Sequence, residues 1–239
     1  MFGSEARVLR SARIFGGHVI ERFNQGTTTR GMRRITEQIP EASTGVCKAL
    51  CMHWVAHHAN DKPGSFSSVA LQAGQRGRYG GVNIVLTQLD YVRALVGANA
   101  TNSERLKDQF TDDFLRKEGL IRQMNIKYPM NNLTVGGNKN SKAGVWLGRE
   151  IGKKIIANHS ANYWSHKIIS LYGRAGAHAV AAFVGADAMF FDPNFGIFYF
   201  EHAYNFRQWF GEPSGFYWAS GYTEILGADY VIKSYAKSI

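Results

Sequence analysis

Cysteine and proline are scarce in this sequence. The 239 residues include only 2 cysteines and 5 prolines, and no Pro-rich or Ser-rich tract interrupts the chain. Cys47 and Cys51 lie four residues apart in a segment with a helical pattern, so both side chains leave the same face, a poor geometry for a mutual disulfide. A secreted scaffold held together by disulfides is therefore excluded, and we expect one compact unit without a long internal linker.

Long apolar runs are also absent. The longest, such as residues 179–184, are far shorter than the roughly 20 residues that a membrane-spanning helix needs. Arg and Glu interrupt the apolar residues near the amino terminus, so we expect no cleavable signal peptide. Any export of this protein would then need a specialised route.

Acidic residues are outnumbered by basic ones. The chain has 28 Lys and Arg against 18 Asp and Glu, which gives a formal net charge of +10. Such a charge attracts nucleic acid, anionic membrane surfaces and acidic proteins without distinguishing among them. With 45% hydrophobic and 13% aromatic residues, the composition is typical of a folded globular protein and excludes a disordered chain.

The first half of the chain has a helical pattern. Residues 1–40 are polar and Arg-rich, and we interpret them as a loosely ordered leader or peripheral arm that precedes the main domain at residues 41–239. Apolar residues spaced three and four apart predict a helix from Cys47 to about Asn60. The pattern of residues 65–162 is mostly helical as well.

Ser43 or Thr44 can cap the predicted helix at its amino-terminal end.

The second half changes to a strand pattern. Short β-branched and aromatic runs, separated by tight turns, predict an antiparallel meander. The predicted strands are residues 167–172, 177–184, 188–191, 197–200 and 229–235, with a helix at about 202–210. A helical half followed by a sheet half is the pattern of an α+β fold.

Three residues at the edges of these elements could form a nucleophilic site. Cys47 lies in the first turn of its helix, where free N–H groups and the helix dipole favour the reactive thiolate. His178 opens one predicted strand and Asp192 ends the next, so a hairpin would bring them together. They follow the cysteine by 131 and 145 residues, and papain-like enzymes place His and a polar residue roughly 130–150 residues after their Cys.

Each of these residues also has a purely structural interpretation. Cys47 could be an inert buried thiol, His178 a core residue, and Asp192 a turn residue before Pro193. The catalytic interpretation depends on the three occurring together, in the order Cys, His, Asp.

Three segments resemble the motifs of the YopT/AvrPphB family of bacterial type III effector cysteine proteases. Residues 45–50 (GVCKAL), with Trp54 following, resemble its nucleophile motif, residues 177–181 (AHAVA) its histidine motif, and residues 190–196 (FFDPNFG) its aspartate motif. The resemblance implies a papain-like fold, with the cysteine helix packed on an antiparallel sheet that carries His178 and Asp192. It also implies catalysis by these residues without a metal or other cofactor.

The donor of an oxyanion hole departs from the usual pattern. Such enzymes usually carry a side-chain amide a few residues before the cysteine, but residues 41–46 contain none. Gln38 is the nearest amide, and we name it with the backbone N–H of Cys47 as the candidate donors; Ser43 is a weaker one.

The resemblance implies a virulence effector that a secretion apparatus delivers into a eukaryotic cell. Its expected partners are host signalling proteins such as Rho-type GTPases or kinases, and its expected location is the host cytoplasm or the inner membrane surface, with an anionic membrane as a further partner. We expect a monomer. The same triad also supports a Gln or Asn deamidase or an acyltransferase, because all of these reactions pass through an acyl-enzyme.

Two other interpretations compete with a thiol hydrolase. Metal binding could use Cys47, Cys51, His53, His57 and His58, but the two cysteines belong to the buried face, and we expect the histidines on an exposed one. A basic nucleic-acid-binding module is the non-enzymatic alternative, based on the charge and on the Gly-Arg stretch at residues 74–81. That stretch is short and does not repeat, so we expect no specific nucleic-acid partner.

Overall fold

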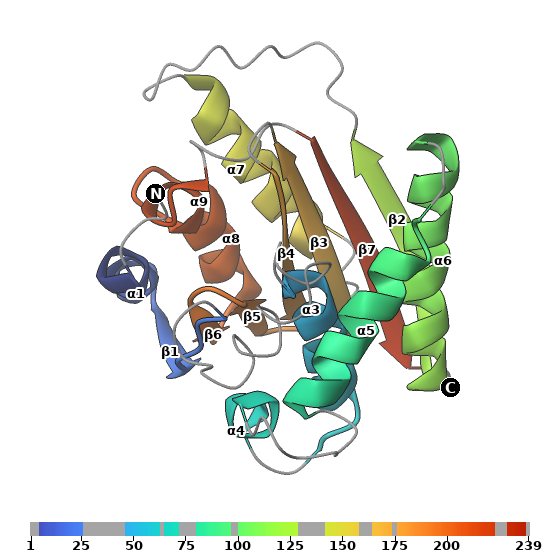
Figure 1. Cartoon of the computed structure of the whole chain (residues 1–239). Helices are drawn as coiled ribbons and strands as arrows, with labels where there is room; N and C mark the ends of the chain where they lie inside the picture. The colour runs from blue at the N-terminus through green and yellow to red at the C-terminus, as the bar shows by residue number, and fades with distance from the viewer. Residues whose placement is uncertain are drawn as a thin grey trace.

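Figure 1 shows the computed structural model, which describes residues 5–25, 46–62, 65–71, 80–96, 100–128, 142–157, 164–173, 176–222 and 229–237. At its centre is a seven-stranded sheet with the strand order β1-β6-β5-β4-β3-β7-β2, in which all neighbouring strands are antiparallel. The strands are β1 (Gly17–Glu21), β2 (Leu120–Tyr128), β3 (Ser165–Gly173), β4 (Gly176–Val184), β5 (Ala188–Asp192), β6 (Gly196–Phe200) and β7 (Asp229–Lys237).

Helices cover both faces of the sheet. They are α1 (Glu5–Ile14), α3 (Cys47–Ala59), α4 (Phe66–Leu71), α5 (Gly81–Arg93), α6 (Ala100–Lys117), α7 (Lys142–Ile156), α8 (Ala203–Gly211) and α9 (Phe216–Ala219). The α+β fold is confirmed, with α3 packed on strands β3, β4 and β5 as expected. Among the described residues, none of the helices is both long and apolar enough to cross a membrane.

The period-two alternation of the strands divides the buried side chains into two cores. Val180, Phe190 and Phe198 belong to the core that the sheet forms with α7, α8 and α9. Ala181 and Phe191, each next to one of these residues in the chain, belong to the core formed with α3, α4 and α5. In Figure 1, α3 accordingly lies on the near side of the sheet and α7 on the far side.

The helix α3 is buried on nearly all sides. Of its 13 residues, only Cys47 and His58 are not fully buried. The expectation of an exposed histidine face is therefore wrong. His53 contacts Phe114 of α6, and His57 packs against Phe66 of α4, so the outer helices cover the face that sequence periodicity assigned to solvent.

The amino-terminal segment also differs from its expected form. Residues 5–25 are not a loose arm, because α1 buries Val8 and Ala12 in the core and β1 pairs with β6 at the edge of the sheet. The indole of Trp209 donates a hydrogen bond of 2.8 Å to Ser11 of α1. The charged residues of α1 lie on its outer face. Its buried apolar residues, Val8 and Ala12, are four apart and therefore face the core together.

The middle of the chain contains a strand that the helical pattern did not predict. β2 pairs with β7 along its length, from Leu120 opposite Lys237 to Tyr128 opposite Tyr230. Its partner strand lies about a hundred residues further along the chain. A pattern within residues 120–128 could therefore not predict this pairing.

Candidate active site

Cys47 is the first residue of α3 and is half-buried. The residue before it, Val46, caps the helix without a side-chain hydrogen bond, while Oε1 of Gln88 in α5 accepts a hydrogen bond of 3.3 Å from the backbone N–H of Ala49. The capping residues expected from sequence, at positions 43 and 44, lie outside the described residues. The thiol thus lies at the positive end of a buried helix, where the dipole stabilises a thiolate.

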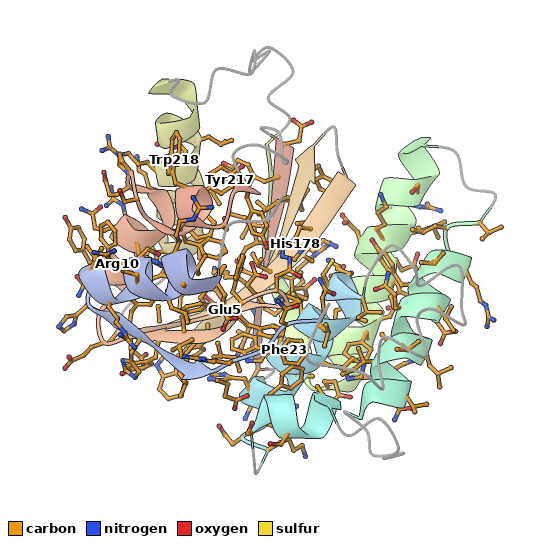
Figure 2. All side chains as sticks on the ribbon, turned by 60° about the vertical axis from the view of Figure 1, so that its left-hand side comes forward. Glu5, Arg10, Phe23, His178, Tyr217 and Trp218 are labelled. Carbon is orange, nitrogen blue, oxygen red and sulfur yellow. The ribbon has the colours of Figure 1, made fainter. Side chains whose placement is uncertain are left out.

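His178 and Asp192 lie at the adjoining ends of β4 and β5, which pair through Ala181 opposite Phe191. The imidazole Nε2 of His178 is 3.1 Å from Oδ1 of Asp192, and both side chains are buried. A carboxylate can only accept, so Nε2 carries the hydrogen. The predicted hairpin therefore brings these two residues together, and Figure 2 shows His178 beside α3.

The three side chains meet at the end of the strands rather than within one core. His178 and Asp192 have the same strand parity as Val180 and Phe190, whose side chains face α7 and α8. Cys47 arrives with α3 on the opposite face of the sheet, and its thiol forms a hydrogen bond with the imidazole of His178. The site therefore joins the two cores where β4 begins and β5 ends.

The electrostatics of this group favour a charged pair. Burial tends to raise the pKa of Cys47, but the hydrogen bond and charge of His178 and a backbone hydrogen bond from Ala179 outweigh it, so the pKa is lowered. Burial tends to lower the pKa of His178, but the charge and hydrogen bond of Asp192, followed by those of Cys47, raise it to about 10. Both shifts favour the thiolate–imidazolium form of the pair over its neutral form.

The second cysteine lies in a different environment. Cys51 is fully buried one turn further into α3, and burial followed by the negative charge of Cys47 raises its pKa well above the usual value. It is a protonated thiol that packs as a small apolar side chain. The two cysteines of the chain thus lie in chemically distinct environments, and Cys47 is the one whose thiolate is favoured.

Asp192 has two further polar contacts that sequence reasoning missed. The hydroxyl of Tyr222 donates to Oδ2 over 2.8 Å, and the backbone N–H of Asn194 donates to Oδ1 over 2.7 Å. Asn194 lies inside the aspartate motif and could have been singled out as a turn residue that contacts the aspartate two positions before it. Tyr222 lies 30 residues from Asp192, and no spacing or periodicity connects them.

The histidines of α3 have different hydrogen-bonding partners. Nε2 of His53 is 2.9 Å from Oγ1 of Thr87, and Nδ1 of His58 is 2.9 Å from Nε2 of His166. Within the described part of the chain, no group of three or more His, Cys, Asp or Glu side chains is arranged to hold a metal ion. The metal interpretation therefore receives no support from the arrangement of these residues.

Two other features named from sequence cannot be located. Gln38, the candidate oxyanion donor, lies outside the described residues, as do residues 74–79 of the Gly-Arg stretch. The role of Gln38 stays a prediction.

The chain is similar in sequence and in fold to known proteins. The family model described as the Yersinia/Haemophilus virulence surface antigen, a peptidase family, matches residues 10–224. The cysteine protease YopT of Yersinia pestis is 30% identical over 210 residues, which cover 85% of this chain and 59% of the relative. The chain thus spans less than two thirds of that relative's length.

A second relative and a solved structure agree with this match. The protein adenylyltransferase and cysteine protease IbpA of Histophilus somni is 28% identical over 221 residues, which cover 90% of this chain and 5% of that protein. The crystal structure of the Pseudomonas avirulence protein AvrPphB matches with a TM-score of 0.51 and 14% identity, over 83% of this chain and 94% of the other. At this identity the likeness concerns the fold alone, and the expected papain-like fold is confirmed.

Proposed function

Because this chain belongs to the Yersinia/Haemophilus virulence surface antigen family of peptidases, we propose that it is a cysteine protease with Cys47, His178 and Asp192 as its catalytic triad. The observation that carries the proposal is the hydrogen-bonded series from the thiol through the imidazole to the carboxylate. Its lowered cysteine pKa and raised histidine pKa are those of a preformed nucleophile and proton donor.

The geometry supports acylation as the first step. The Cys47 thiolate attacks the carbonyl carbon of the scissile peptide bond, and the resulting oxyanion accepts hydrogen bonds from the backbone N–H of Cys47 and, in our proposal, from the side chain of Gln38. The bond to nitrogen then breaks, and His178 donates its Nδ1 proton to the leaving amine. The free amine and a thioester at Cys47 remain.

Deacylation uses the same residues in reverse roles. Neutral His178 takes a proton from water while the water oxygen attacks the thioester carbon. The C–S bond breaks, the carboxylic acid leaves, and the thiolate and imidazolium are restored. Asp192 keeps Nε2 protonated in both steps, so that Nδ1 is the nitrogen that exchanges protons with the substrate.

We propose that the substrate is a protein of a eukaryotic host cell, with Rho-type GTPases or kinases as the expected class, and that the enzyme reaches the host cytoplasm or inner membrane surface as a secreted effector. Relatives named as virulence proteins and cysteine proteases support this class of function. Arg7, Arg10 and Arg13 are exposed at three-residue spacing on α1 and form one basic face. Such a face is suited to an anionic membrane or an acidic partner.

Mass spectrometry of host-cell proteins after exposure to the wild-type protein and to Cys47→Ala tests the proposal. New chain termini that depend on Cys47 would establish proteolysis. A gain of about one dalton, from replacement of NH₂ by OH, would instead identify a deamidase, and a gain of an acyl mass an acyltransferase. Host proteins that stay unchanged in both samples would contradict the whole proposal.

A further inference from the structure

The carboxylate of Asp192 accepts more hydrogen bonds than the triad requires. His178 uses Oδ1 at 3.1 Å, but the backbone N–H of Asn194 also donates to Oδ1, and the hydroxyl of Tyr222 donates to Oδ2 at 2.8 Å. Asp192 itself is fully buried. Since a buried carboxylate oxygen without a donor is costly, the Tyr222 hydroxyl determines how this group can be oriented.

We propose that Tyr222 is a positioning residue of the active site, whose hydroxyl holds Oδ2 of Asp192 so that Oδ1 stays directed at the imidazole of His178. This inference rests on the proposed function, because it assigns a role within the same site. The Tyr222 hydroxyl is bonded to Asp192 and Asn194, so it acts on the imidazole through Asp192.

The ring of Tyr222 is held in place on several sides. It is fully buried and lies beside the imidazole of His178, with ring centroids 5.0 Å apart. It also packs against the rings of Phe195 and Phe216, with ring centroids 6.1 and 5.6 Å away. Packed aromatic side chains of this kind have little freedom to rotate, so the hydroxyl has a defined position relative to Asp192.

The hydrogen-bond roles around this hydroxyl are also determined. Nδ2 of Asn194 donates to the Tyr222 oxygen over 3.1 Å, so the tyrosine oxygen accepts there and directs its own hydrogen to Oδ2 of Asp192. Burial, followed by the charge of Asp192, raises the pKa of Tyr222 well above its usual value. The phenol therefore stays protonated and remains a donor over the whole range of physiological pH.

The amino-terminal segment contacts this network through Gln25. Nε2 of Gln25 donates to Oδ1 of Asn194 over 2.8 Å, and the backbone N–H of Gln25 donates to the carbonyl of Pro193 over 2.7 Å. Gly196, at the end of the same turn, comes so close to residue 21 that a Cβ would lie 2.2 Å from the Glu21 carbonyl oxygen. Residues 21–25 therefore brace the turn that carries Asp192, and a change in Gln25 should reach the triad through Asn194 and Tyr222.

The test is the pH profile of Cys47 alkylation by iodoacetamide in the full chain, because it reports the thiolate whether or not a protein substrate is known. In Tyr222→Phe the carboxylate loses one donor and its fixed orientation, so it supports the imidazolium less well. We expect the acidic midpoint of the profile to move to higher pH, and the alkylation rate at a fixed pH below the wild-type midpoint to fall about tenfold. If a substrate has been found, kcat should fall with KM unchanged.

Tyr235→Phe is the matched control. Tyr235 is also a fully buried tyrosine whose hydroxyl donates to an aspartate, Asp112, over 2.9 Å, but this pair lies between α6 and β7. Loss of this hydrogen bond should lower the melting temperature about as much as Tyr222→Phe does. It should leave the pH profile of Cys47 alkylation unchanged. Gln25→Ala should shift the profile in the same direction as Tyr222→Phe and by less, and it provides the measurement if Tyr222→Phe fails to fold.

The outcomes separate this inference from the function on which it rests. A wild-type thiol that reacts at low pH, together with unshifted profiles in Tyr222→Phe and Gln25→Ala, would overturn the positioning role and leave the triad intact. Equal shifts in Tyr222→Phe and Tyr235→Phe would also overturn it, since they would reflect general loosening. A wild-type Cys47 that titrates like an ordinary thiol would overturn both the triad and the role of Tyr222.

Discussion

Nε2 of His178 lies 3.1 Å from Oδ1 of Asp192 across the β4–β5 hairpin, and this contact determines which ring nitrogen is left for the thiol. The carboxylate accepts from Nε2, so Nδ1 is the nitrogen available to Cys47, with which the imidazole also forms a hydrogen bond. The orientation of a single imidazole thus connects the helix that carries Cys47 to the strand that carries Asp192.

The two cysteines should respond differently to substitution. We expect Cys47→Ala to abolish activity while the protein stays folded, because it removes the nucleophile from a half-buried site. Cys51→Ala should retain activity and lower the free energy of unfolding by about 1 kcal/mol, because it only shortens a buried side chain. Activity assays with thermal unfolding, and mapping of the iodoacetamide adduct at neutral pH, are the measurements. Preferential labelling of Cys51 would contradict the assignment.

His178 and Asp192 should differ in importance. His178→Ala removes proton transfer altogether and should leave no measurable activity. Asp192→Asn keeps an imidazole that is poorly oriented, and kcat should fall roughly 100-fold or more. Circular dichroism of both variants serves as the folding control. Full activity in His178→Ala would mean that the base lies elsewhere, with His202 as the next residue to test.

The pH dependence of activity follows from the two shifted groups. The active pair needs a deprotonated Cys47, whose pKa is lowered from 9.0, and a protonated His178, whose pKa is raised to about 10. Activity should therefore rise as pH increases through the lowered cysteine pKa, and fall as pH approaches 10 and the imidazolium loses its proton. A kcat/KM profile over pH 4–11 checks this. An acidic limb located near pH 9 would contradict a preformed thiolate.

Gly196 should tolerate no side chain. Its φ is +116°, and a Cβ would lie 2.2 Å from the carbonyl oxygen of Glu21. We expect Gly196→Ala to lower the free energy of unfolding by about 3 kcal/mol or more, since backbone strain and a backbone clash act together. Gly119→Ala is the control, because Gly119 also has a positive φ of +80° but no atom within 4 Å of its Cβ position. Equal losses in urea unfolding would show that the contact with Glu21 contributes nothing.

The central elements of the fold were predictable from local patterns. Apolar residues three and four apart predicted α3, and short β-branched and aromatic runs between turn residues predicted β3 to β6, each within two residues of its bounds. The edges of the sheet were not predictable. β1 pairs with β6 and β2 pairs with β7 across long stretches of chain, and a polar edge strand carries little local signal of its own.

The amino-acid sequence by itself determined which residues could react: a cysteine at the start of a helix, followed at papain-like distances by a histidine and an aspartate on neighbouring strands. Local periodicity and chain order are sufficient for this, because both depend on residues close together or on their order. Only the tertiary structure decided that α3 is enclosed by other helices, that β1 pairs with β6 at the edge of the sheet, and that Tyr222 bonds to Asp192 and Gln25 to the neighbouring Asn194. These contacts join residues far apart in the chain, and they exist only once both cores have packed around the sheet.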